Sequence, residues 1–178
     1  MIRPTPPTPA SFDLTIGLFG TCGKSSWRKS FIERYESLGI PYFNPQVENW
    51  NSAFAQEEAV HLVADGIVLF PVTNESYATG SLAETGFSIL SAIRANSHRY
   101  ILIWIAADLD PVLKEENPLA AQESMRARSL VRAHVRENRH PNVFIVEGLS
   151  QMLAVSILLH QSLRSIASAR ALIEGHVA

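Results

Sequence analysis

A short motif places a carboxylate just after an apolar run in this sequence. Gly80-Ser81-Leu82-Ala83-Glu84 follows the apolar residues 66–72 and opens a stretch typical of a helix. In open α/β folds, ligands bind at the carboxyl ends of the strands, which is where this motif falls. A carboxylate that faces a pocket there has the chemistry of a nucleophile at a sugar C1 carbon. The glycine leaves room for a ligand near the backbone.

The same five residues also match a capping box, with Ser81 at the N-cap and Glu84 at N3. In that interpretation both side chains bond only to backbone N–H groups at the start of the helix. The structural and the catalytic interpretations are compatible if Ser81 caps the helix while Glu84 turns outward.

A second carboxylate is needed, because glycosidic bond cleavage uses one carboxylate as the nucleophile and another beside the leaving group. Glu57 lies eight residues before Asp65, about two helical turns back toward the carboxyl edge of the sheet. We therefore predict that Glu57 shares a pocket with Glu84, and that Asp65 lies at the opposite edge. The alternative is that Glu57 and Glu58 belong to a solvated helix face.

The loop Gly20-Thr21-Cys22-Gly23-Lys24-Ser25 joins the first predicted strand to a helix. Free N–H groups at a helix N-terminus favour anions, so we expect an anion or sugar-hydroxyl site here. The loop resembles a P-loop, but that pattern requires a glycine where this chain has Leu18, and residues 70–72 offer no Asp for magnesium. A small-molecule kinase is therefore the weaker alternative, and a plain turn is the structural one.

Two aromatic residues flank the predicted pocket. Trp50 lies in a polar loop after Asn44 and can stack on a base or fold over the rim of the core. Tyr77 precedes the Gly80 motif and is predicted to wall the pocket.

Arginines recur every four residues at Arg128, Arg132 and Arg136. Such a stripe on a helix is typical of a solvated face. A phosphate-binding or subunit-contact role is the alternative.

Strand and helix patterns alternate five times, which predicts one α/β domain: a doubly wound three-layer sandwich with a five-stranded parallel sheet in the order 2-1-3-4-5, as in flavodoxin-like folds. The predicted strands are 13–20, 41–45, 66–72, 100–106 and 142–147, and the predicted helices are 26–38, 52–64, 81–95, 118–138 and 149–174. The Pro-rich residues 1–12 form a predicted flexible tail, and 13–178 the single domain.

Composition narrows the function classes. The 178 residues are 47% hydrophobic and 18% charged, with a formal net charge of −2, which argues against binding to nucleic acid polymers or anionic membranes. The single Cys22 fits a reducing compartment, so we expect a cytoplasmic protein. The histidines have no metal-site spacing, and we expect neither a metal nor a cofactor.

Several of these segments together resemble the nucleoside 2-deoxyribosyltransferase family, in particular its "like" branch. The resemblance covers roughly residues 14–106. It rests on Gly20-Thr-Cys-Gly23 with Trp27-Arg28, Tyr42-Phe-Asn-Pro45 with Glu48-Asn-Trp50, Ala64-Asp65-Gly-Ile-Val68, and Gly80-Ser-Leu-Ala-Glu84.

The resemblance implies that Glu84 is the nucleophile on the sugar C1′ and that Glu57 assists departure of the base. It also implies that the first loop binds the sugar or its 5′-phosphate. The candidate substrate-binding residues are Gly20, Thr21, Cys22, Trp27, Arg28, Asn44, Trp50, Tyr77, Gly80 and Ser81.

The resulting hypothesis is an enzyme that transfers or hydrolyses the N-glycosidic bond of a nucleoside or nucleotide, through a covalent glycosyl–Glu84 intermediate. The transferases of the family carry an Asp six residues before the nucleophile, where this chain has Ala78. That difference motivates the alternative of a non-catalytic nucleotide or nucleotide-sugar sensor on the same fold. The apolar helix predicted at 149–174 offers more hydrophobic surface than one sheet face covers, so we expect a homo-oligomer.

Overall fold

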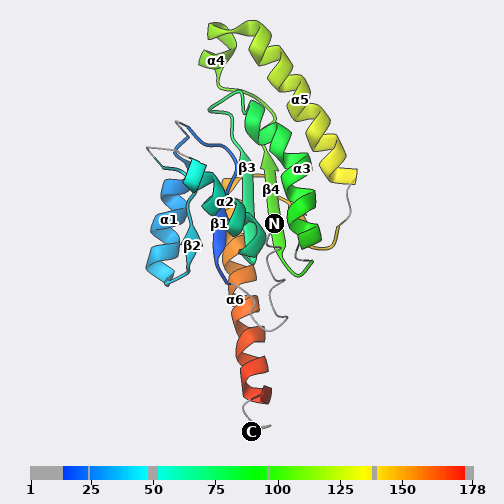
Figure 1. Ribbon diagram of the computed structural model, residues 1–178. Helices are drawn as coiled ribbons and strands as arrows, with labels where there is room; N and C mark the ends of the chain where they lie inside the picture. Colours follow the sequence, from blue (N-terminus) through cyan, green and yellow to red (C-terminus); the bar gives the residue numbers. More distant parts are fainter. Residues whose placement is uncertain (1–13, 24, 48–51, 96, 138–139, 175–178) are drawn as a thin grey trace.

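The computed structural model describes residues 14–23, 25–47, 52–95, 97–137 and 140–174. A five-stranded parallel sheet lies at the centre, in the order β2-β1-β3-β4-β5, which confirms the predicted fold class and strand order (Figure 1). The strands are β1 (Ile16–Leu18), β2 (Tyr42–Phe43), β3 (Ile67–Val72), β4 (Tyr100–Ile105) and β5 (Val143–Ile145). β3 and β4 pair along six residues each, so they form the rigid centre of the sheet.

Helices cover both faces of the sheet because alternate strand residues point to opposite sides. Val68, Phe70 and Val72 pack with α2, α3 and α5, whereas Ile67 and Leu69 pack with α1 and α6. The helices are α1 (Trp27–Leu38), α2 (Ser52–Ala64), α3 (Thr79–Ala95), α4 (Pro111–Glu116), α5 (Pro118–Glu137) and α6 (Leu149–Glu174). β3 is buried along its whole length, as its unbroken apolar run predicts.

Two differences from the predicted elements bear on the site. The helix α4 was not predicted; Asp110 caps it by accepting a hydrogen bond from the Val112 N–H, and Pro111 takes the first helical position. The helix α3 begins at Thr79, two residues earlier than predicted.

Arg128 corrects another prediction, because it does not belong to a solvated stripe. It is fully buried, and its guanidinium donates to the carbonyls of Val72, Thr73, Ser76 and Ala106. Burial lowers the pKa of Arg128 to about 10.

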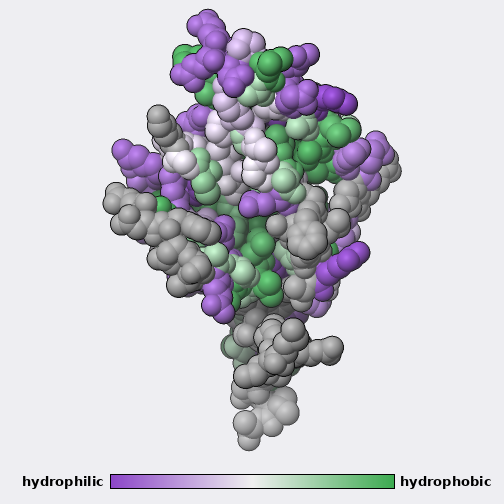
Figure 2. Space-filling model, turned by 45° about the horizontal axis from the view of Figure 1, so that its top comes forward, coloured by the Kyte–Doolittle hydropathy of each residue, from purple (hydrophilic) through white to green (hydrophobic). Residues whose placement is uncertain are grey.

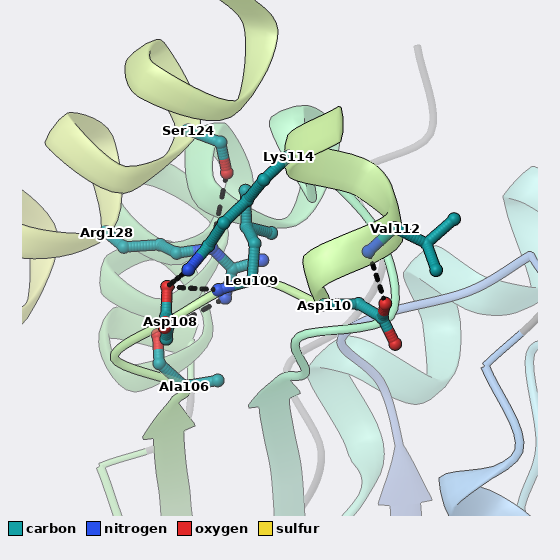
Figure 3. A network of polar contacts seen from close by, with 8 residues as sticks. All are labelled: Ala106, Asp108, Leu109, Asp110, Val112, Lys114, Ser124 and Arg128. Atoms are coloured by element: carbon teal, nitrogen blue, oxygen red, sulfur yellow. Dashed lines mark hydrogen bonds and ion pairs between the residues drawn. The ribbon is translucent and has the colours of Figure 1, made fainter. Parts of the chain in front are cut away.

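The surroundings of Arg128 explain why a charge can be buried there (Figure 3). Its Nε also donates to the Ser124 hydroxyl, 3.2 Å away, and the nearby Asp108 carboxylate favours the charged guanidinium. Arg128 therefore ties the carboxyl ends of β3 and β4 to the loop that leads into α3.

We predict that Arg128→Met lowers the free energy of unfolding by about 3 kcal/mol, because four carbonyls lose their donor in a buried setting. The exposed Arg126 lies on the same helix, and Arg126→Met should change stability by no more than about 0.5 kcal/mol. Urea denaturation followed by circular dichroism measures both. Equal stabilities of the two variants would show that the Arg128 contacts contribute nothing.

Candidate functional site

A cleft of about 520 Å³ lies at the carboxyl edge of the sheet, where β1 and β3 end. Its size is that of small-molecule sites. It is lined by Gly20, Cys22, Gly23, Pro45, Gln46, Val47, Glu58, Gly80, Ser81 and Glu84. Five of the sequence-predicted site residues therefore share one cleft: Gly20, Cys22, Gly80, Ser81 and Glu84.

Glu84 reaches the cleft from α3, but not through a capping box. The first helical hydrogen bond of α3 runs from the Leu82 N–H to the Ala78 carbonyl, 2.8 Å. Ser81 is therefore already inside the helix, and its carbonyl accepts a bond from the Thr85 hydroxyl. The capping-box interpretation is wrong because α3 begins at Thr79, two residues before Ser81, directly after Ala78, whose φ is 53°.

Ser81 and Glu84 are three residues apart on α3, so they lie on the same face of the helix. Both line the cleft together with Gly80. Among the described residues outside its own helix turn, no atom lies within 4 Å of where a Cβ of Gly80 would be, which leaves room for a ligand at the start of the helix.

The second carboxylate in the cleft is Glu58, where the sequence had predicted Glu57. The side chain of Glu58 is half-buried, and that of Glu57 is exposed outside the cleft lining. One residue along an α-helix rotates a side chain by about 100°, so neighbours cannot share a face. The helix α2 thus supplies a second carboxylate to the cleft, as the sequence predicted, but the residue is Glu58 and not its neighbour Glu57.

Glu58 and Glu84 interact electrostatically. Burial, followed by repulsion from the Glu84 carboxylate, raises the pKa of Glu58, and Arg28 opposes the rise. Glu84 stays open to solvent, but partial desolvation raises its pKa as well. Two carboxylates in one cleft, both with a raised pKa, are candidates for an acid and nucleophile pair.

The first loop is built to approach β3 closely. Gly20 has a φ of 88°, and a Cβ there would lie 2.4 Å from the Pro71 carbonyl oxygen. Thr21 is buried: its N–H and hydroxyl donate to the Pro71 carbonyl, and its Oγ1 accepts from the Thr73 N–H. Thr21 therefore fixes the loop to β3 and is not itself in the cleft lining.

The buried side chains of Trp27 and Arg28 hold this loop from the interior of the protein. The Trp27 indole N–H donates to the Thr21 carbonyl, 3.0 Å away, and its ring packs edge-on against Phe31 in the core. The buried Arg28 guanidinium donates to the carbonyls of Leu18, Phe19 and Thr21. These two residues were predicted to touch substrate; the structure places them behind the cleft wall, where they position the loop.

The loop after β2 forms the third wall of the cleft; the sequence predicted Asn44 and Trp50 in this region, and it missed the lining residues Pro45, Gln46 and Val47. The Gln46 side chain donates to the Gly23 carbonyl, 2.7 Å away, and accepts from Arg28. Asn44 accepts a bond from the Gln46 N–H, which shapes the turn, and it is not among the residues that line the cleft. A glutamine directly after Asn-Pro was the available signal. Trp50 lies outside the described residues.

Tyr77 does not wall this cleft. Its hydroxyl donates to the Leu113 carbonyl in α4, 2.8 Å away, and its carbonyl accepts from the Ser124 hydroxyl. It lines a separate groove between α3 and α5 with apolar residues such as Leu82 and Val131. Leu130, which also lines this groove, is exposed. Figure 2 shows hydrophobic surface among the hydrophilic residues of the upper part of the molecule.

The P-loop alternative gains little from the geometry around Ser25. Its hydroxyl is buried, donates to the Glu75 carboxylate, and lies 3.3 Å from the Thr73 hydroxyl. A carboxylate at that position repels a phosphate. Lys24 lies outside the described residues.

The described part of the chain contains no group of three or more His, Cys, Asp or Glu side chains able to hold a metal ion. Nor is any helix within those residues long and apolar enough to cross a membrane.

Comparisons with known proteins support the fold class and give no information on the chemistry of the cleft. No family model matches the chain, and no curated protein matches it. Among solved structures, it is similar to the crystal structure of the RPS4 and RRS1 TIR domain heterodimer, with a TM-score of 0.52 and 9% sequence identity, over 82% of this chain and 96% of that one. At this identity the likeness shows a shared fold alone, the parallel α/β sheet with helices on both faces.

The coupling of the two glutamates gives a prediction with a definite sign. The negative charge of Glu84 disfavours ionisation of Glu58, so Glu84→Gln should lower the pKa of Glu58. The measurement is an NMR titration of the side-chain carboxyl carbons. The exposed Glu57 provides a matched control, since Glu57→Gln should leave the pKa of Glu58 in place. If the pKa of Glu58 is the same in Glu84→Gln as in the wild-type protein, the two carboxylates do not interact electrostatically.

Proposed function

We propose that this protein cleaves the N-glycosidic bond of a nucleoside or nucleotide, with Glu84 as the nucleophile and Glu58 as the general acid. The observation that carries the proposal is the placement of both carboxylates in one cleft at the carboxyl edge, with the pKa of Glu58 raised by burial and by Glu84. The resemblance of the sequence motifs to nucleoside 2-deoxyribosyltransferases supports the same chemistry.

In the first step, a Glu84 carboxylate oxygen forms a bond to C1′ while the C1′–N bond breaks. The bonding electron pair leaves with the base, and Glu58 gives the base nitrogen its proton. In the second step, water or another base attacks C1′, the C1′–Oε bond to Glu84 breaks, and the Glu58 carboxylate accepts the proton of the attacking group. Water gives hydrolysis, and a second base gives transfer.

The cleft walls suit the two ends of such a substrate. The Gly20–Gly23 loop brings backbone and the Cys22 side chain to the cleft, suited to a sugar hydroxyl or a 5′-phosphate. Pro45 and Val47 offer an apolar surface on the opposite loop, which suits the face of a base.

The decisive experiment is to incubate the protein with a panel of nucleosides and nucleotides and to measure released base by chromatography. Glu84→Gln should lower the rate at least about a thousandfold, because the covalent step loses its nucleophile. Glu58→Gln should lower it about a hundredfold or more for bases that need protonation. Glu57→Gln is the matched control and should keep its activity.

Full activity of Glu84→Gln on every substrate would rule out the covalent mechanism. Calorimetric binding of a nucleotide by the wild-type protein, with no base released from any compound, would favour the sensor alternative.

We further propose that the protein self-associates through α6. Met152 and Leu163 of this helix are buried against the sheet, whereas Leu158 and Ile166 are 62% and 45% exposed. The far end of α6 extends beyond the sheet toward the C-terminus (Figure 1). Exposed leucine and isoleucine along one helix are typical of a subunit contact.

Sedimentation velocity tests the contact. The wild-type chain should sediment as a dimer or larger species, and the double variant Leu158→Glu/Ile166→Glu as a monomer. Leu119→Glu changes an even more exposed leucine, on α5, and should leave the assembly intact. A wild-type monomer at all concentrations contradicts the proposal.

A further inference from the structure

A second cleft, of about 770 Å³, lies at the same edge of the sheet but beside β4 and β5. Its lining shares no residue with the Glu84 cleft: Asn74, Ile103, Trp104, Ile105, Ala106, Ala107, Asp108, Arg132, Val135, Arg136, Ile145, Val146 and Glu147. It arises because β5 ends opposite Ile103, so the last residues of β4 have no neighbouring strand on that side.

The inner part of this cleft is apolar. Ile103 and Ile105 belong to the core cluster between the sheet and α5, and Val135 packs against that cluster from the helix. Ile145 on the edge strand is 43% exposed. Ile103 and Ile105 are themselves buried, so the apolar surface that an entering ligand meets is that of the exposed Ile145 and the half-buried Val135.

The helix side of the cleft carries two guanidinium groups. Arg132 and Arg136 are one turn apart on α5, and both line the cleft. Among the described residues, neither makes an ion pair or a hydrogen bond, in contrast to Arg128 on the same stripe. Two like charges at this spacing repel each other, and an anion between them removes the repulsion.

The acids of the lining do not cancel this charge. Asp108 pairs with Lys114, 2.6 Å away, and the bond from Lys114 holds the pKa of Asp108 below its usual range (Figure 3). Glu147 is exposed at the rim. With Asp108 balanced by Lys114, two arginines face one glutamate, so the cleft keeps a positive charge.

We propose that this cleft binds an organic phosphate monoester, with the phosphate between Arg132 and Arg136 and the apolar group against Val135 and Ile145. A phosphate fits better than a carboxylate because it carries close to two negative charges at neutral pH and has enough oxygens to accept from both guanidinium groups. The site is independent of the Glu84 cleft and does not rest on the proposed function.

The test uses phenyl phosphate as the probe, with inorganic phosphate and benzoate as comparisons, in NMR titrations of the ¹⁵N-labelled chain. Amide signals of Ala106, Ala107 and Glu147 should shift. Phenyl phosphate should bind at least about tenfold more tightly than benzoate, which has a single charge. It should also bind more tightly than inorganic phosphate, which lacks the apolar group.

Matched variants locate the phosphate. Arg132→Gln and Arg136→Gln should each weaken binding of phenyl phosphate at least about fivefold. Arg126→Gln, which removes an exposed arginine of α5 that does not line the cleft, should leave it unchanged. Glu84→Gln should retain full binding, so failure here and failure of the proposed function are distinguishable.

Several outcomes would overturn the assignment. They are the absence of any shift, equal binding of benzoate and phenyl phosphate, shifts confined to the Gly20–Gly23 loop and Ser81, or unchanged binding in folded Arg132→Gln and Arg136→Gln.

Discussion

The buried guanidinium of Arg128 organises the working edge of this protein. It donates to four backbone carbonyls that come from the ends of β3 and β4 and from the loop between β3 and α3. A planar group with five fixed donors suits this position better than lysine would, since the carbonyls converge from several directions. The loop it holds ends at Ala78, where the chain enters α3, and thereby determines where Glu84 lies relative to the sheet.

The first loop has an equivalent support in Arg28, whose guanidinium is also buried and also donates to backbone carbonyls. Burial lowers the pKa of both arginines. The walls that the first loop and α3 give to the Glu84 cleft are therefore each fixed from behind by a buried cation.

This arrangement separates positioning from chemistry. The polar groups of the Glu84 cleft are two carboxylates, a thiol, a hydroxyl, the Gln46 amide and backbone next to glycines. In the proposed mechanism, one of these carboxylates acts as the nucleophile and the other as the general acid. The second cleft, across β4, has the opposite character, with an apolar floor and unpaired guanidinium groups among the described residues. Both clefts lie where α/β sheets commonly place their ligands, and α3 and the loop held by Arg128 lie between them.

The likeness to a TIR domain at 9% identity fits a fold in which the sheet is determined by pattern rather than by particular residues. Alternation of buried strands with amphipathic helices is enough to specify a parallel sheet and its right-handed connections. Chemistry on such a scaffold depends on the loops at the carboxyl edge, where neighbours of the same fold are free to differ.

The sequence by itself determined the fold class, the strand order and the place of Glu84 at the carboxyl edge, because hydrophobic periodicity and glycine positions are local signals. The sequence also predicted that α2 supplies the second carboxylate of the Glu84 cleft. Only the tertiary structure decided between Glu57 and Glu58. Adjacent side chains on a helix point about 100° apart, and the sequence pattern of α2 does not determine how the helix is rotated against the sheet. The same limit applies to Arg28, Arg128 and Tyr77. Their types suggested ligand contacts or solvated faces, yet the backbone carbonyls they bind come from other segments, up to 56 residues away in the case of Arg128 and Val72. Contacts of that range exist only once the sheet has brought its strand ends together.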